Sequence, residues 1–204
     1  MLARFKKCLD LEDKYAHVEN GASFYIERSK DTLRIFFQHS NGKIDWKNNF
    51  DFPARPYRDM KDSWYCHRGF LKVWKSVEPY VEEYVFDLSI NKVEIVGYSH
   101  GGAIAQLCYE YVRFHRPDVD VKGWGFGAPR VVWGKTSSAA RERFEGFLTV
   151  INANDIVTKL PPKWFGYHHI GSTLQIDLGS KGPIDDHRPE NYLEMLEAVR
   201  GERG

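Results

Sequence analysis

Hydrophobic residues along the chain recur at spacings that alternate between those of strands and those of helices. The apolar runs that predict strands are 22–29, 32–38, 92–98, 121–127, 147–153 and 167–176. The stretches that predict helices lie within residues 1–20, 69–86, 100–114, 129–145 and 189–199. Because strands and helices follow one another in turn, we expect an α/β fold with a mostly parallel central sheet and helices on both faces.

Two segments depart from this regular order. Pro79 lies inside the helical pattern of 69–86, which predicts a kink or two consecutive helices. Residues 39–66 are irregular and rich in aromatic side chains, with Pro53 and Pro56 as helix breakers. Long irregular segments in compact domains are often lids or binding loops. We therefore treat 39–66 as a candidate lid or binding loop, with packing in the core as the equal alternative.

Composition narrows the classes of partner. The 204 residues suit one domain, so we expect 1–204 to be a single domain. The 29 basic and 28 acidic residues leave a net charge of +1 without a long run of one sign, which argues against a nucleic-acid partner. The three cysteines form neither a disulfide framework nor a zinc pattern, so no metal site is predicted. Aromatic residues reach 15%, which suits either an aromatic core or an apolar cleft.

The first residues bear on location. Charged residues at Arg4, Lys6, Lys7 and Asp10 interrupt the apolar stretch that a signal peptide would need. No apolar run is long enough to form a transmembrane segment. These patterns predict a cytoplasmic location, and export by a non-standard route stays open.

The segment Gly97-Tyr98-Ser99-His100-Gly101 matches the pattern G-x-S-x-G between a predicted strand and a predicted helix. In this nucleophile elbow, Gly97 and Gly101 give room for a tight turn that exposes the Ser99 hydroxyl. The backbone N–H of His100 then faces the oxygen of an attacked carbonyl. Ser99 is therefore the candidate nucleophile. The alternative is a glycine-rich turn with an incidental serine.

A serine nucleophile needs a base and an acid that orients the base, which follow it in the chain in this architecture. Asp155 comes just after the strand 147–153, where the acid is expected, although an aspartate there can simply cap a turn. His187 precedes the last helix and is the first candidate for the base, unless it is an ordinary surface residue. His169 is the second candidate.

Several segments together resemble the class 3, or fungal-type, lipase family of the α/β-hydrolase superfamily. The matching stretches run from about residue 33 to 193, most of the chain. They are Gly97–Gly102 (G-x-S-x-G-G), Phe126–Val131 (F-G-x-P-R-V), Val150–Val157 with Leu160-Pro161-Pro162 (V-N-x-x-D-x-V…L-P-P), Asp186-His187…Tyr192 (D-H…Y), His67–Phe70 (H-x-G-F) and His169–Gly171 (H-x-G). The resemblance implies an α/β-hydrolase fold with a minimal cap. It also implies that Ser99, Asp155 and His187 are the triad and that His169 is not catalytic.

One segment departs from the family pattern. The family has F-R-G-T or F-R-G-S after the second strand, and its Thr or Ser supplies an oxyanion donor. Here the stretch is Phe37-Gln38-His39-Ser40, in which His39 replaces a glycine. The resemblance implies that Ser40 is the second oxyanion donor beside His100. The alternative is that Ser40 is a turn residue next to Asn41-Gly42.

These observations predict a serine hydrolase that cleaves carboxylic esters of acylglycerols or related lipids through an acyl-enzyme. The expected partners are a lipid or ester substrate and, transiently, a lipid interface, and no metal or organic cofactor is required. The same triad would serve a phospholipase A1, a thioesterase or an acyltransferase. A non-catalytic binding module that has kept the fold is the alternative from another class, because the Gln38-His39 segment is altered.

Overall fold

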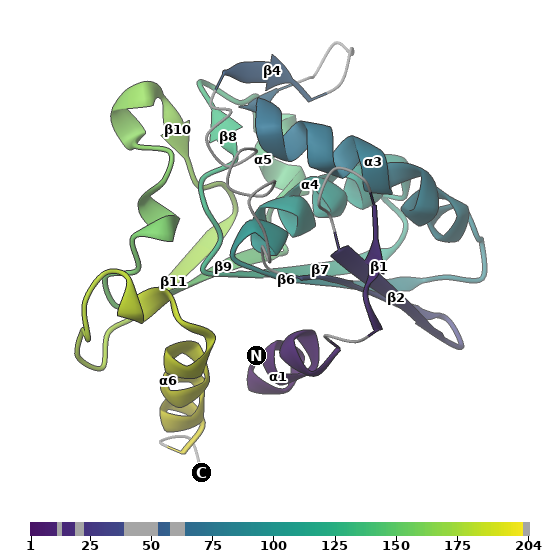
Figure 1. Cartoon of the computed structure of the whole chain (residues 1–204). Helices are drawn as coiled ribbons and strands as arrows, with labels where there is room; N and C mark the ends of the chain where they lie inside the picture. The colour runs from purple at the N-terminus through teal and green to yellow at the C-terminus, as the bar shows by residue number, and fades with distance from the viewer. Residues whose placement is uncertain (12–13, 19–22, 39–52, 58–63, 202–204) are drawn as a thin grey trace.

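The computed structural model describes residues 1–11, 14–18, 23–38, 53–57 and 64–201 (Figure 1). Its centre is a seven-stranded sheet. In spatial order the strands are β1 (Ala16–His17), β2 (Ser23–Ser29), β3 (Thr32–Phe37), β6 (Lys92–Tyr98), β7 (Asp120–Phe126), β9 (Phe147–Asn152) and β11 (Ser172–Ile176). From β3 to β11 every pairing is parallel, and β1 and β2 add an antiparallel edge. The predicted, mostly parallel sheet is confirmed.

Helices cover both faces of this sheet (Figure 1). On one face lie α3 (Arg68–Val85), α4 (His100–His115) and α5 (Ser138–Arg143), and on the other lie α1 (Leu2–Asp10) and α6 (Pro189–Gly201). Short 3₁₀ helices follow in the connections: η2 (Val157–Lys159), η3 (Lys163–Phe165) and η4 (Asp185–His187). The layers explain why the central strands are mostly buried and rich in apolar residues, since both faces are covered.

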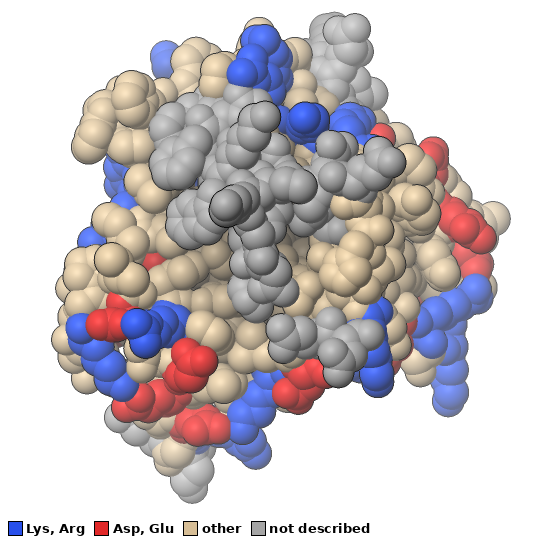
Figure 2. Space-filling view, in the orientation of Figure 1, with Lys and Arg blue, Asp and Glu red and all other residues tan. Residues whose placement is uncertain are grey.

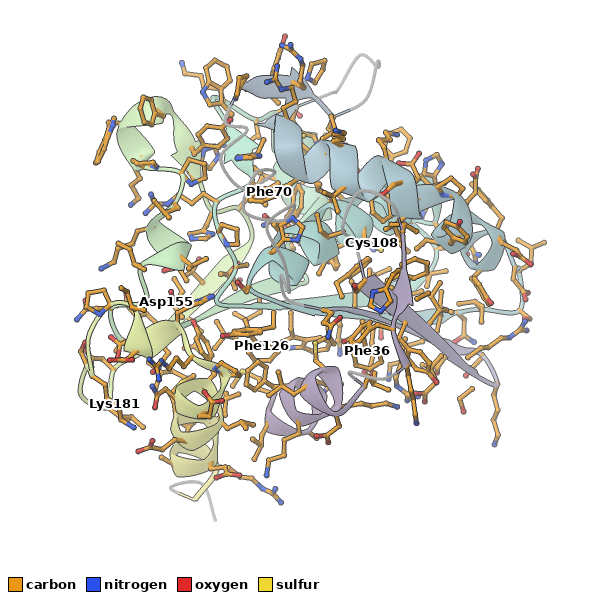
Figure 3. All side chains as sticks on the ribbon, viewed as in Figure 1. Phe36, Phe70, Cys108, Phe126, Asp155 and Lys181 are labelled. Carbon is orange, nitrogen blue, oxygen red and sulfur yellow. The ribbon has the colours of Figure 1, made fainter. Side chains whose placement is uncertain are left out.

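Successive side chains of the central strands enter two separate hydrophobic clusters. In β6, Val93 and Ile95 pack with α3 and α4, whereas Val96 and Tyr98 pack with α1 and α6. Figure 3 shows the same division, with Phe70 and Cys108 above the sheet and Phe36 and Phe126 below it. This alternation is the period of two expected for a strand between two layers.

A second, four-stranded antiparallel sheet lies beside the first. Its order is β10 (Tyr167–His168), β8 (Val132–Trp133), β5 (Tyr65–His67) and β4 (Ala54–Pro56). Part of the candidate lid 39–66 therefore forms strands, which was not predicted. Residues 39–52 and 58–63 of that segment lie outside the described residues. Tyr57 and Trp64 stack on each other with ring centroids 4.7 Å apart and are buried, so these two aromatics belong to the core.

Two further predictions need correction. Of the two outcomes predicted for Pro79, the division into two consecutive helices is wrong, because α3 runs unbroken over 18 residues, and the kink stays a prediction. The proline removes one hydrogen bond, to the carbonyl of the exposed Lys75, while the buried face of the helix stays intact. The predicted strand 167–176 is two strands of different sheets. The chain turns between them at Gly171, which has φ of 78° and whose Cβ, if present, would lie 2.7 Å from the Phe147 carbonyl oxygen.

Candidate active site

The turn from β6 to α4 places Ser99 at the carboxyl edge of the central sheet. Ser99 has φ of 56° and ψ of −126°, in a region that costs energy for any residue with a side chain. Its backbone N–H donates to the Phe126 carbonyl oxygen at 2.8 Å, which fastens the turn to β7. The strained turn is the geometry of a nucleophile elbow.

Gly97 and Gly101 allow the strand and the helix to approach closely enough for this turn. A Cβ on Gly97 would lie 2.1 Å from the Gly101 carbonyl oxygen. A Cβ on Gly101 would lie 2.4 Å from the carbonyl oxygens of Phe37 and Gln38, at the end of β3. These obstacles are backbone atoms that cannot rotate away, so both positions require glycine.

Gly97→Ala is accordingly expected to lower the free energy of unfolding by more than about 3 kcal/mol, because the methyl group meets backbone on the other side of the turn. Urea denaturation measures the change. Gly201→Ala is the matched control, since nothing lies within 4 Å of its Cβ position in α6, and it should be neutral or stabilising. Equal stability of the Gly97→Ala and parent proteins would contradict this account of the elbow.

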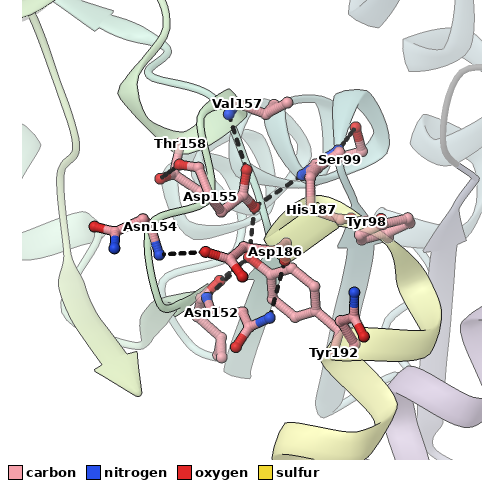
Figure 4. A network of polar contacts seen from close by, with 12 residues as sticks. Tyr98, Ser99, Asn152, Asn154, Asp155, Val157, Thr158, Asp186, His187 and Tyr192 are labelled. Atoms are coloured by element: carbon pink, nitrogen blue, oxygen red, sulfur yellow. Dashed lines mark hydrogen bonds and ion pairs between the residues drawn. The ribbon is translucent and has the colours of Figure 1, made fainter. Parts of the chain in front are cut away.

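The structure brings Ser99, His187 and Asp155 together in one hydrogen-bonded row (Figure 4). Ser99 Oγ lies 2.8 Å from His187 Nε2, and His187 Nδ1 lies 2.8 Å from Asp155 Oδ2. The carboxylate is fully buried. Since a carboxylate accepts, Nδ1 carries a proton towards it, and Nε2 of the neutral ring is left to accept the serine proton.

Two further donors hold the Asp155 carboxylate in place. The backbone N–H of Val157 donates to Oδ1 at 2.8 Å, and the hydroxyl of Tyr192 donates to Oδ2 at 2.7 Å. The Tyr192 oxygen in turn accepts from the Asn152 N–H at 3.1 Å. A buried carboxylate that accepts three hydrogen bonds, counting that from His187, has its charge compensated and its position fixed.

The imidazole of His187 is held from the other side by Tyr98. The two rings stack with centroids 5.4 Å apart and planes at 20°, and the Tyr98 hydroxyl donates to the His187 carbonyl oxygen. The neighbouring Asp186 is buried and accepts from the backbone N–H groups of Asn154 and Lys181, at 3.0 and 2.8 Å. These bonds fasten η4, the short helix that carries the candidate base.

Gly127 lies where the triad side chains crowd most closely. It has φ of 59°, and a Cβ there would come within 3.1 Å of Asp155, His187 and Tyr192 side-chain atoms. Sequence reasoning placed Gly127 and Tyr192 only within family-like motifs and gave no role to Tyr98. The signals were nonetheless present: Tyr98 is the variable position before the serine, and Tyr192 lies just inside the last predicted helix.

His169, the second candidate for the base, is not at this site. Its Nε2 lies 2.8 Å from the Thr158 carbonyl oxygen, which can only accept, so Nε2 carries the proton there. Burial lowers the pKa of His169 to about 4, and the pKa of His100 is lowered to about 4 by burial and by the charge of His67. Both rings are thus neutral in the folded protein at neutral pH.

The two buried histidines make stability depend on pH. Because their pKa is lower in the folded than in the unfolded chain, the unfolded chain takes up more protons, and stability falls as pH drops below about 6.5. We expect each to cost about 2 kcal/mol of unfolding free energy between about pH 7 and pH 5. Urea denaturation across this range measures the loss. His169→Gln should remove the part of this loss that His169 contributes, whereas His17→Gln on the exposed β1 should leave the loss unchanged. If the free energy of unfolding of His169→Gln falls with pH as steeply as that of the parent, His169 is not neutral in the folded protein.

Of the two candidate oxyanion donors, the structure describes one. His100 is the first residue of α4, so its N–H has no acceptor within the helix and faces outward beside Ser99. Ser40 lies outside the described residues. The chain is described as far as Gln38, whose carbonyl oxygen borders the elbow at Gly101.

The described residues contain no group of three or more His, Cys, Asp or Glu side chains arranged to hold a metal ion. None of the helices in this part of the chain combines the length and apolar character needed to cross a bilayer.

Comparison with known proteins gives relatives among fungal lipases. A secreted mono- and diacylglycerol lipase of Fusarium solani is 25% identical over 183 residues, which are 88% of this chain and 53% of that protein. Secreted mono- and diacylglycerol lipase MDL5 of Malassezia globosa is 32% identical over 139 residues, 62% of this chain and 42% of the relative. The chain thus spans about half the length of these relatives.

The names of these relatives bear on location. Both are described as secreted, as is a lipase of Malassezia restricta, so the prediction of a cytoplasmic location is wrong. The N-terminal segment on which it rested is α1, whose Leu2, Phe5 and Cys8 pack under the central sheet. Among its charged residues, Arg4 pairs with Glu94 of β6 and Lys7 with Glu27 of β2, so these charges have a place in the folded domain.

Solved structures of lipases share the fold of this chain, and the chain also matches the sequence pattern of one protein family. Lipase II of Rhizopus niveus superposes with a TM-score of 0.66 at 23% identity, covering 80% of this chain and 65% of that one, which establishes the α/β-hydrolase fold. The pattern described as lipase (class 3) matches residues 34–165, more than half of the chain. This protein therefore belongs to the class 3 lipase family.

Proposed function

We propose that the protein hydrolyses carboxylic esters of acylglycerols through an acyl-enzyme on Ser99. The observation that carries the proposal is the unbroken row of hydrogen bonds from Ser99 Oγ through His187 to the buried Asp155 carboxylate. The strained backbone at Ser99 supports it, because such strain is typical of nucleophiles in this architecture.

In the first half-reaction, Ser99 Oγ attacks the ester carbonyl carbon while His187 Nε2 takes the hydroxyl proton. The carbonyl electron pair moves onto oxygen, where the His100 N–H donates to the negative charge. We assign the second donor to Ser40. When the tetrahedral intermediate collapses, the bond to the leaving oxygen breaks and His187 returns the proton to the departing alcohol.

In the second half-reaction, His187 removes a proton from water, and the resulting hydroxide attacks the acyl carbonyl. The Ser99 oxygen leaves and regains the proton from His187, which frees the carboxylic acid. Asp155 accepts the hydrogen bond from Nδ1–H throughout and stabilises the transient imidazolium. Tyr192 and Val157 position this carboxylate and take no part in bond changes.

Acylglycerols are proposed because the relatives from Fusarium solani and Malassezia globosa are named mono- and diacylglycerol lipases. Those names also support action outside the cell, and we propose transient contact of this chain with a lipid interface. We further propose that 1–204 acts as one catalytic domain, since both hydrophobic clusters pack on the sheet that carries the triad.

A fluorophosphonate probe tests the nucleophile directly. We expect one covalent adduct per chain by intact mass, located on Ser99 by peptide mapping. Ser99→Ala should take up none, and urea denaturation of that variant verifies that it is folded. Labelling at another residue, or none in the folded parent protein, would overturn the assignment and favour the non-catalytic binding module.

An ester panel then tests the substrate class. Monoacyl-, diacyl- and triacylglycerols are compared with phospholipids and thioesters of the same acyl chain, and transfer to added alcohols is measured alongside. A higher kcat/KM for acylglycerols supports the proposal. Preference for the sn-1 ester of phospholipids, for thioesters, or for transfer over hydrolysis would replace it with one of the other uses of the triad.

A further inference from the structure

We infer that the small antiparallel sheet and η3 form a surface that docks the protein on lipid surfaces bearing anionic headgroups. The inference extends the proposed function, because it gives the enzyme a means of reaching aggregated substrate. We call this the basic-aromatic surface, and it consists of Tyr65, Trp133, Trp164 and Phe165 with the cations Arg55, Lys135 and Lys163.

The aromatic part is a contiguous chain of exposed rings. Trp164 is 82% exposed and Phe165 55%, which is unusual for side chains of this size. Their rings lie 6.1 Å apart, and the indole N–H of Trp133 donates to the Phe165 carbonyl oxygen at 2.7 Å. Trp133 in turn meets the Tyr65 ring edge to face at 5.8 Å. Tyr and Trp at such a surface are suited to the boundary between water and acyl chains.

The segments that carry these rings hold cations and no acidic side chain, although Glu142 and Glu145, at α5, line a pocket together with Lys135. The described segments 53–57, 64–68, 129–137 and 156–173 contain no Asp or Glu, although the chain as a whole holds 28 among 204 residues. Lys135 and Lys163 are exposed and make no ion pair with any residue that the structure describes. The sequence at 58–63, outside the described residues, holds two basic and two acidic residues and so adds no net charge.

The colouring of Figure 2 agrees with this distribution. At the upper left, where β10 lies in Figure 1, the surface is tan and blue, whereas the acidic side chains visible in that view gather along the lower left and the right. The whole chain is nearly neutral, so the cations of these segments are a local excess and not part of a general positive charge. Anionic headgroups complement it, with each exposed Lys or Arg adding affinity.

The surface is fixed relative to the candidate triad. Asp155 leads through η2 directly into η3, so the chain passes from the site to the exposed rings without a long loop. The Arg130 backbone N–H donates to the Leu160 carbonyl oxygen at 2.6 Å, and its guanidinium donates to the Pro161 carbonyl oxygen at 3.1 Å. A membrane bound here would meet the same end of the protein as the triad (Figures 1 and 3).

Vesicle binding tests the inference in a Ser99→Ala background, where no hydrolysis alters the lipid. Sedimentation with phosphatidylcholine vesicles is compared with sedimentation with equal amounts of phosphatidylcholine and phosphatidylglycerol. We expect at least tenfold tighter binding to the anionic vesicles, weakened by salt. The double variant Lys135→Glu with Lys163→Glu should bind anionic vesicles more weakly than the parent, by about fivefold or more for each lysine replaced. Trp164→Ala with Phe165→Ala should weaken binding to both vesicle types.

Matched variants at the opposite end of the strands serve as controls. Phe86→Ala with Leu88→Ala removes exposed apolar side chains before β6, and Lys122→Glu reverses an exposed charge on β7. These should bind vesicles like the parent. Equal binding to neutral and anionic vesicles, or parent-like binding by the Lys135/Lys163 and Trp164/Phe165 variants, would overturn the docking surface.

A soluble short-chain ester separates this inference from the proposed hydrolysis. With Ser99 restored, the docking variants should hydrolyse the dissolved ester with parental kcat/KM, because the rings and lysines lie outside the triad. A parent protein that binds anionic vesicles as expected but leaves the ester intact refutes the proposed hydrolysis alone. Hydrolysis of the ester without vesicle preference refutes the docking surface alone.

Discussion

His187→Ala is expected to lower kcat for a soluble ester by about 10⁶-fold, to the level supported by the oxyanion donors and binding alone. The imidazole is the one group within hydrogen-bond distance of Ser99 Oγ among the described residues, so its loss leaves the hydroxyl without a base. Initial rates over a range of ester concentrations give kcat and KM. We expect KM to change little, because the ring acts on the proton rather than on the acyl group.

A double variant distinguishes a triad from two independent contributions. Ser99→Ala should lose as much activity as His187→Ala, and the variant carrying both should lose no more than either. His17→Ala, at an exposed position on β1, controls for the loss of a histidine as such. Additive losses, or retention of a tenth of the activity in His187→Ala, would contradict the shared proton-transfer role.

Asp155→Asn is expected to lower kcat by about 10⁴-fold with little change in fold, because the amide has nearly the shape of the carboxylate. The amide oxygen can still accept from Val157, but an amide N–H then faces His187 Nδ1. Nδ1 must accept, the ring proton moves to Nε2, and Nε2 can no longer take the serine proton. Rates with the soluble ester measure the effect, and urea denaturation verifies folding.

Asp185→Asn is the control for this substitution. Asp185 lies on the same short helix as His187 and pairs with Arg188 at the surface, with no contact to the triad carboxylate. Its kcat should stay within about twofold, as is usual for an exposed ion pair of small energetic weight. An Asp155→Asn variant that loses no more than this control would show that the carboxylate does not set the tautomer.

Sequence patterns predicted the central sheet well because its strands are long enough to show their periodicity. β6 and β9 are mostly apolar and mostly buried, and helices follow in the order that a parallel sheet requires. The candidate triad followed from chain order at the ends of those strands, although the nearness of residues 99, 155 and 187 could only be seen in three dimensions. The assignment of Ser40 as the second oxyanion donor stays a prediction, because Ser40 lies outside the described residues.

The parts that sequence reasoning missed are those held by few or distant contacts. β4, β8 and β10 have two or three residues each, too short for any period to emerge. They exist because β4 pairs with β5, and β8 pairs with both β5 and β10. Tyr192 reaches Asp155 from 37 residues away, and nothing local in its helix reveals that contact. The predicted division of the helix at Pro79 is wrong because the packing of α3 outweighs one lost hydrogen bond.

The order of the elements in the chain has a consequence for biosynthesis. A growing polypeptide that has emerged through β11 possesses all seven strands of the central sheet and the serine of the elbow. It still lacks η4 and α6, and with them the imidazole of His187 and the hydroxyl of Tyr192. Under the proposed mechanism, a chain that ends before η4 has the nucleophile without its base, and we expect such chains to be inert towards esters.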